Sequence, residues 1–266
     1  MKGKYHLVQV KPTIDLFGNN AWDAGDVLFD WYPFEIPRGG CCIKSMRVMK
    51  PGTNGAAAAG IDMEIFFAKS VNGVAPTTLG DTDSAITLIN ATACRNNIIG
   101  HKFLDASAME NSDELVGYNI WTNTAPTAVD YADINIVLEG EPGPYRTDST
   151  YSATTSGYQT IWIAALTIGT PDFGTAVLLN QAGNQAVSTT AVDLVVDGTD
   201  ADDVFCIGDE LISFVAADGT SPAVIGTVTS IPDADSIVVD KVETAFDDDT
   251  EIVFRRPVTL NLGIEY

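Results

Sequence analysis

The sequence has few of the residues on which enzymes and zinc sites most often depend. Only two histidines occur in its 266 residues, His6 and His101, and no G-x-S-x-G nucleophile motif accompanies them. The four cysteines, Cys41, Cys42, Cys94 and Cys206, show no C-x-x-C spacing, and the adjacent pair is poorly placed for a disulfide. We therefore predict no catalytic residues, no cofactor and no zinc centre, with reduced cysteines and structural histidines.

Basic residues are also scarce. Lys and Arg number 14 against 36 Asp and Glu, so the formal net charge is −22 at pH 7. A surface this acidic repels nucleic acid and anionic lipid, and we expect neither as a partner. No apolar run approaches the roughly 18 residues of a membrane span, and no signal peptide precedes the first strand pattern. The sequence predicts a chain made in the cytoplasm that stays soluble or joins an assembly.

The acidity is uneven along the chain. Residues 1–150 contain 18 acidic and 11 basic residues, a balance of −7, whereas residues 151–266 contain 18 and 3, a balance of −15. Most of the second excess lies in 190–251, where 16 acidic residues accompany one lysine. Such a shift is typical of a domain boundary. The sequence predicts a domain of 1–187 plus 257–266, and a small acidic module of 188–256.

What the sequence does contain is a series of β patterns separated by turn residues. The clearest covers 61–67, where an apolar residue occupies every second position from Ile61 to Phe67. Further strand patterns cover 4–12, 27–36, 41–50, 84–93, 115–123, 131–141, 157–169 and 174–183. Since neither helical heptads nor βαβ alternation occur, we predict an all-β protein whose larger domain is a jelly-roll-like antiparallel sandwich.

The acidic module has a strand and turn pattern of its own. Residues 205–213 read F-C-I-G-D-E-L-I-S, and 225–231 read I-G-T-V-T-S-I. Gly208-Asp209 and Asp218-Gly219 are turn pairs, and the Ile, Val and Thr positions suit a half-buried pleated surface. We predict a small β-barrel here. Residues 257–266 alternate without this acidity, so we predict that they return to the sandwich and that the module is an insertion near the C-terminus.

Two acidic loops contain the oxygen ligands that Ca²⁺ prefers. Residues 197–203 read D-G-T-D-A-D-D, and 247–251 read D-D-D-T-E. The first lacks the Gly at the sixth position and the Glu at the twelfth that an EF-hand loop needs. We favour solvated turns over calcium sites at both loops. The calcium candidates are Asp197, Asp200, Asp202, Asp247 and Asp249.

A cluster of aromatic residues lies between positions 22 and 34. Such a cluster can form the core and edge of one sheet, a subunit interface, or a platform on which sugar rings stack. We favour core or interface. The interface candidates are Trp22, Phe29, Trp31, Tyr32 and Phe34.

The pattern of the acidic module carries a resemblance to a known group of proteins. The positions concerned are Phe205, Ile207, Gly208, Asp209 and Leu211, followed by Ile225, Gly226, Thr227, Val228, Ile231, Ile237 and Val239. This pattern resembles small β-modules of tailed-bacteriophage structural proteins. The preceding stretch, 160–187, is similar to virion proteins of marine cyanobacterial phages. The resemblance covers about 160–240 and implies a virion component.

Among virion roles, a tailed-phage major capsid protein needs a long spine helix, which the sequence does not predict. The resemblance therefore implies a capsid decoration, or cement, protein that binds the major capsid protein on the outer surface of the head, as a homotrimer. The sandwich would dock on the shell and the acidic module would face solvent. The alternatives are a tail, collar or fibre component, such as a tail tube or glycan-binding receptor-binding protein. An enzyme on a β scaffold, such as a glycan lyase, is disfavoured because the chain is short and has no repeats.

Overall fold

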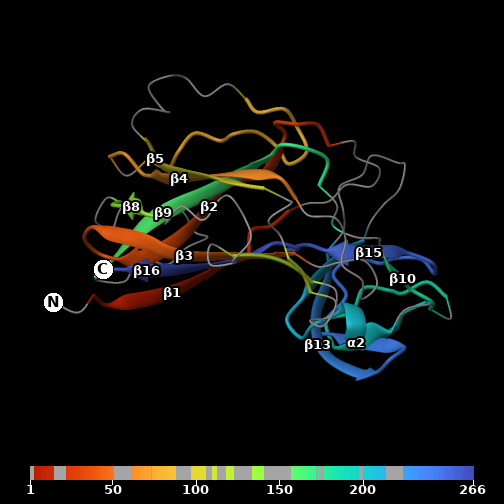
Figure 1. Ribbon diagram of the computed structural model, residues 1–266. Helices are drawn as coiled ribbons and strands as arrows, with labels where there is room; N and C mark the ends of the chain where they lie inside the picture. Colours follow the sequence, from red (N-terminus) through yellow and green to blue (C-terminus); the bar gives the residue numbers. More distant parts are fainter. Residues whose placement is uncertain are drawn as a thin grey trace.

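The computed structural model in Figure 1 is built almost entirely from antiparallel strands, which confirms the all-β prediction. It describes residues 3–14, 22–50, 61–72, 74–87, 97–105, 110–112, 118–122, 134–140, 157–171, 173, 177–181, 183–197, 200–213 and 224–266. Within these ranges, no helix has the length and apolar character needed to cross a membrane.

Two sheets make up the larger part of the molecule. The first contains β1 (Tyr5–Val10), β3 (Cys41–Lys50), β6 (Glu110–Ser112), β7 (Tyr118–Thr122), β8 (Ile136–Leu138) and β16 (Thr259–Glu265). Its order is β1–β16–β3–β7–β6, and β8 also pairs with β3. The second contains β2 (Val27–Pro37), β4 (Met63–Lys69), β5 (Ile98–Leu104) and β9 (Tyr158–Thr167), in the order β2–β9–β4–β5.

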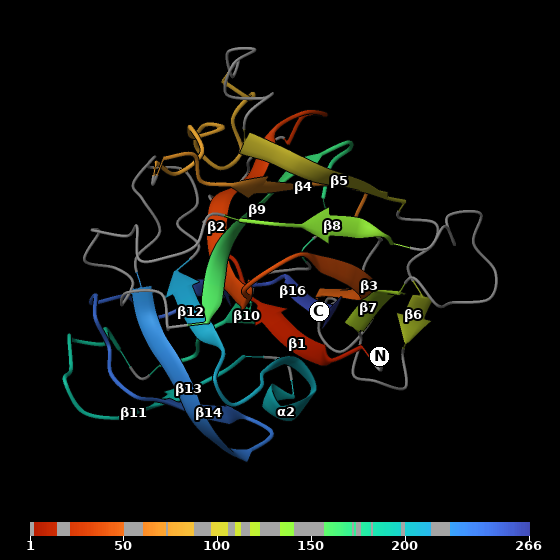
Figure 2. The same ribbon diagram turned by 90° about the vertical axis from the view of Figure 1, so that its left-hand side faces the viewer.

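The two sheets face each other across one hydrophobic core. In β4 the period-two pattern places Met63, Ile65 and Phe67 in this core with no exposed surface. The ring of Phe67 meets that of Phe34 in β2, with centroids 6.4 Å apart. β16 buries Leu260, Leu262 and Ile264 against the same core from the other sheet. Figure 2 shows β4, β5 and β9 on one side of this core and β3, β16 and β1 on the other.

A third antiparallel sheet holds the acidic part of the chain. Its strands are β10 (Val177–Leu178), β11 (Val192–Val195), β12 (Glu210–Ser213), β13 (Val224–Asp233), β14 (Ser236–Val239) and β15 (Glu251–Phe254). The order is β10–β15–β12–β13–β14–β11, and the single-turn helix α2 (Ala201–Val204) joins β11 to β12. This sheet has a separate hydrophobic core. β10 contributes to it, so the third sheet begins before residue 188.

The third sheet is not the closed barrel that the sequence predicts. Its end strands, β10 and β11, meet at one isolated bridge, between Leu179 and Val196, and at a hydrogen bond of 2.9 Å from Asn180 N to Val195 O. A closed barrel requires a continuous ladder around its circumference. Because β10 has only two residues, the described part of the sheet curls without closing.

The chain enters and leaves the third sheet from the sandwich. After β9 it builds the third sheet, and it then returns as β16, the strand predicted for 257–266. β16 lies between β1 and β3, with a register that runs from Tyr5↔Glu265 to Val10↔Leu260 on one side. Figure 1 shows the third sheet as a separate body at the right-hand end of the molecule.

Candidate functional site

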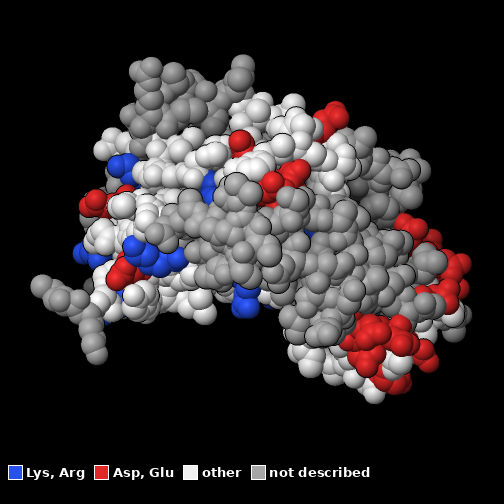
Figure 3. Space-filling view, in the orientation of Figure 1, with Lys and Arg blue, Asp and Glu red and all other residues white. Residues whose placement is uncertain are grey.

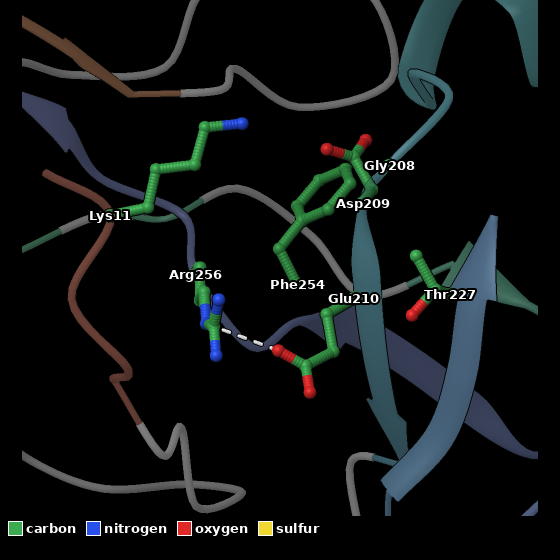
Figure 4. Close-up of a pocket in the computed structure, with 7 residues that line it drawn as sticks. All are labelled: Lys11, Gly208, Asp209, Glu210, Thr227, Phe254 and Arg256. Carbon is green, nitrogen blue, oxygen red and sulfur yellow. Dashed lines mark ion pairs between the residues drawn. The ribbon is translucent and has the colours of Figure 1, made fainter. Parts of the chain in front are cut away.

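The surface is hollowed where the first sheet meets the third. A groove of about 680 Å³ lies at this junction, beside a smaller hollow of about 260 Å³. Lys11, Asp209, Phe254 and Arg256 line both, so the two form one continuous depression. Figure 4 shows the smaller hollow, with Lys11 and Arg256 on one side and Asp209 and Glu210 on the other.

The floor of the groove is the outer face of the first sheet. The strand register places Gln9, Asn261 and Arg47 in one row across β1, β16 and β3. The Gln9 side chain donates a hydrogen bond of 3.2 Å to Asn261 Oδ1. Leu7 lies one position further along this face of β1 and is 70% exposed. The floor therefore combines polar amides, a guanidinium group and an unusually exposed leucine.

The opposite wall is the turn that contains the I-G-D sequence. Asp209 N donates to Cys206 O at 3.0 Å, and Cys206 N donates to Asp209 Oδ2 at 2.7 Å, so the turn is closed twice. Gly208 has a φ of 97°, which the third position of such a turn requires and only glycine adopts freely. Ile207, at the second position, is thereby left at the tip of the turn, where it is 71% exposed.

Most other apolar residues of the pattern found in the acidic module are buried in the core of that module. The buried apolar members are Phe205, Leu211, Ile225, Val228, Ile237 and Val239. Gly226 is needed because a Cβ there would collide with the carbonyl oxygen of Lys241. Core packing and backbone geometry thus account for these positions. They do not account for Ile207, the one apolar member of the pattern that is exposed.

Glu210 ties the wall of the groove to the strand that returns to the sandwich. Its carboxylate meets Arg255 Nη1 at 2.6 Å and Arg256 Nε at 3.1 Å. The backbone adds to this link, because Arg255 N donates to Glu210 O and Arg255 O accepts from Ile14 N, at 2.8 and 2.9 Å. Next to Glu210, burial raises the pKa of Asp209, although the Cys206 N–H and the charge of Lys11 both favour its carboxylate.

Five charged side chains of the groove have no ion partner within 4.0 Å among the described residues. Lys11 and Arg47 lie on the sheet side, Asp202 and Asp203 lie on α2, and Asp209 lies on the turn that follows it. Within the described residues, the groove therefore presents cations together with Leu7 on the sheet side, and carboxylates together with Ile207 on the module side. Such a surface suits a polymer with polar and apolar groups, since paired charges and exposed apolar area both favour association.

The five calcium candidates do not come together in the part of the chain that the structure describes. Asp197, Asp200, Asp202, Asp247 and Asp249 are all exposed, and no three His, Cys, Asp or Glu side chains there form a metal-binding group. Other acidic residues of the module close turns instead. Asp233 Oδ1 accepts from Asp235 N at 3.0 Å and from Ser236 Oγ at 2.8 Å.

The five aromatic candidates lie in the sandwich, away from the groove. Trp22, Phe29 and Phe34 are 8%, 1% and 7% exposed and belong to the core between the two sheets. Tyr32 packs on the edge of that core, and Trp31 is half-buried with its Nε1–H donating to Thr77 O at 2.8 Å. Only Trp31 and Tyr32 thus present part of a ring to the surface.

The groove itself was not predicted from the sequence, although one signal for it exists. The segment Y-H-L-V-Q-V has apolar residues at odd and even positions alike. Val8 and Val10 face the core, which leaves Tyr5 and Leu7 on the outer face at 71% and 70% exposure. A strand that is apolar on both faces and is not central in its sheet is a sign of a covered surface. Comparison of the chain with protein-family models and with curated proteins found no match.

Proposed function

We propose that this chain is a non-enzymatic structural protein of a tailed-phage virion, and that it is a decoration protein that binds and stabilises the head. The observation that carries this proposal is the arrangement of strands around the acidic insertion. We propose that the sandwich is a jelly roll, the architecture of many viral capsid domains, and its strand order supports this proposal. The insertion contains the phage-like pattern.

The support for a jelly roll comes from eight of the ten strands of the two sheets, counted in chain order with β6 and β7 set aside: β1, β2, β3, β4, β5, β8, β9 and β16. One sheet then contains the first, eighth, third and sixth strands, and the other contains the second, seventh, fourth and fifth. These are the alternating sheets that two interlocked Greek keys produce. In this proposal the module is inserted between the seventh and eighth strands. Because β10 pairs with β15, the module covers 177–256 rather than 188–256.

The orientation that we propose follows from the charges. Figure 3 shows acidic side chains gathered over the third sheet, whereas the sandwich end of the same view carries both signs. A protein present in many copies on a shell benefits from an acidic outer surface, because like charge keeps the particles apart in solution. We therefore propose that the sandwich docks on the major capsid protein, that the module faces solvent, and that the protein assembles as a trimer.

The test is the copy number of this chain in purified particles of the phage that encodes it, measured by quantitative mass spectrometry against the major capsid protein. Hundreds of copies, in a fixed ratio to that protein, are expected for a decoration protein. A few to a few dozen copies would assign the chain to a tail, collar or fibre instead. Absence from the particles would contradict a virion role altogether.

A further inference from the structure

The edge of the first sheet at β1 has the properties of a binding site for another strand. The register with β16 determines which backbone groups of β1 face outward. Lys4 and Tyr266 exchange two hydrogen bonds, of 3.2 and 3.0 Å, so residues 4, 6, 8 and 10 bond toward β16. The N–H and C=O groups of Tyr5, Leu7 and Gln9 therefore point away from the sheet, and no described residue pairs with them. Figure 2 shows β1 at the end of this sheet.

The edge lacks most of the features that keep natural edge strands unpaired, although Lys4 and Lys11 flank β1. No proline, bulge or inward-facing charge interrupts β1, which pairs continuously with β16 over six residues. Two of its three exposed side chains, Tyr5 and Leu7, are apolar, and the third is Gln9. Of the eight large apolar side chains exposed in the described part of the chain, Tyr5 and Leu7 belong to β1 itself. Two more lie close by, Tyr266 opposite Lys4 and Ile207 across the groove.

The charges around this edge select the occupant. The described segment 3–14 contains Lys4 and Lys11 and no acidic residue, and Arg47 adds a third cation on the groove floor. None of the three has an ion partner within 4.0 Å among the described residues. On the far wall, Asp202, Asp203 and Asp209 have the opposite charge. An acidic strand is therefore attracted to the β1 side of the groove, where the cations lie, and not to the module side.

A second copy of this chain is a poorer fit to the same edge. Segment 3–14 contains no acidic residue, so antiparallel pairing of two β1 strands would bring Lys4 and Lys11 of both copies together with no carboxylate from either strand to offset them.

We propose that β1 and the groove bind an extended acidic segment of a different protein by strand addition. The segment continues the first sheet through the N–H and C=O groups of Tyr5, Leu7 and Gln9. Its apolar side chains cover Leu7 and contact Ile207 on the groove face, and its carboxylates, which alternate to the other face of the added strand, lie on the side of Lys4. This role gives a function to Ile207, the exposed residue of the module pattern. The inference concerns this edge alone and holds whether or not the chain belongs to a virion.

The probe is an N-acetylated, C-amidated octapeptide of alternating valine and glutamate, labelled for fluorescence anisotropy and titrated with the full chain. We expect saturable binding that weakens with salt, and we expect new hydrogen-exchange protection at the amides of Tyr5, Leu7 and Gln9. Two control peptides separate the contributions. A peptide of alternating valine and lysine tests the contribution of charge. The valine–glutamate peptide with a methyl group on the amide nitrogen of every valine tests the contribution of backbone pairing. Neither control is expected to bind.

Two substitutions test the site from the side of the protein. Leu7→Pro removes an outward N–H without touching the β1–β16 ladder, and it should weaken binding of the octapeptide by more than about tenfold. Leu7→Thr keeps the N–H and loses apolar contact, so a smaller loss is expected. Val137→Thr alters a side chain that is 61% exposed on β8, away from the edge, and should change nothing. Protection of the Val8 and Val10 amides reports that β1 is still folded.

Several outcomes would overturn the proposal. Binding of the valine–glutamate peptide that survives Leu7→Pro, or equal binding of the lysine or N-methylated peptides, would place the interaction elsewhere or make it non-specific. Absence of binding at millimolar peptide would remove the site. Self-association of the wild-type chain that Leu7→Pro abolishes would assign the edge to a second copy. If Leu7→Pro does not fold, the N-methylated peptide and the exchange protection decide the matter.

Discussion

The sandwich and the acidic module are both antiparallel β structures, but their acidic residues have different surroundings. In the module, half-buried carboxylates accept backbone N–H groups: Asp209 closes a turn at Cys206 N, and Asp240 accepts from Thr227 N at 2.8 Å. In the sandwich, Asp26 closes a turn in the same way, at Asp23 N, but it is 7% exposed, and its charge and that of Asp23 act on Asp83. The turn is the same in both bodies, but in the sandwich three carboxyl groups oppose one another's ionisation.

Each body also has a core of its own. Substitutions that leave a cavity in one core should have the largest effect on the stability of that body. Leu211→Ala empties a site with no exposed surface in the module, and Ile65→Ala does so in the sandwich. Each should reduce the free energy of unfolding of its own body by about 2–5 kcal/mol. Amide hydrogen exchange resolves the two bodies. If either substitution lowers amide protection equally in the sandwich and in the module, the two bodies unfold as one unit.

Gly226→Ala should have the next largest effect, and only on the module. A Cβ at this position would meet the carbonyl oxygen of Lys241, a backbone atom that cannot move without disturbing β13 and β14. We expect a loss of about 1–3 kcal/mol in urea unfolding. Gly169→Ala is the matched control, because nothing lies within 4 Å of its added Cβ. If Gly226→Ala is as stable as Gly169→Ala, the close approach of residue 226 to the carbonyl oxygen of Lys241 is contradicted.

Asp83→Asn should stabilise the sandwich, and the effect should depend on pH. Burial, followed by the charges of Asp26 and Asp23, raises the pKa of Asp83. A raised pKa means that the folded state disfavours the carboxylate, so wild-type stability relative to the variant falls as pH rises above the ordinary aspartate value of about 4. Asparagine also tolerates the φ of 58° found there.

Urea unfolding at pH 3 and at pH 7 measures this effect. The variant and the wild type should be equally stable at the lower pH, and the variant should be more stable at the higher. Asp81→Asn removes the same charge from an exposed position in the same loop and is expected to change little at either pH. A stabilisation that is the same at both pH values would point to a conformational cause rather than to ionisation.

Calcium should have the smallest effect of all. Because the module's exposed carboxylates do not converge in the described residues, millimolar Ca²⁺ should leave the melting temperature of the chain unchanged. Magnesium at the same ionic strength is the control for general screening. A rise in melting temperature that is specific to calcium would show that carboxylates of the acidic loops bind the ion.

Much of the fold could be predicted from period-two patterns, because burial on one face imposes that period directly. The pattern at 61–67 predicted β4. The fall in acidic residues after Pro257, together with the alternation there, predicted β16 as a strand outside the module. The barrel prediction was wrong because local pattern does not determine how many residues of β10 and β11 pair at closure. The groove was also missed. It depends on the meeting of Leu7 and Ile207, which lie 200 positions apart in the sequence.

The central claim is that the sandwich performs the docking and that the module, an insertion, faces away from the partner. The most direct measurement is cosedimentation with phage heads of the chain that lacks 177–256, with a short Gly/Ser linker joining the ends. Circular dichroism first establishes that the shortened chain is folded. We predict binding equal to that of the full chain. A folded sandwich that no longer binds the heads would contradict the claim and assign docking to the module.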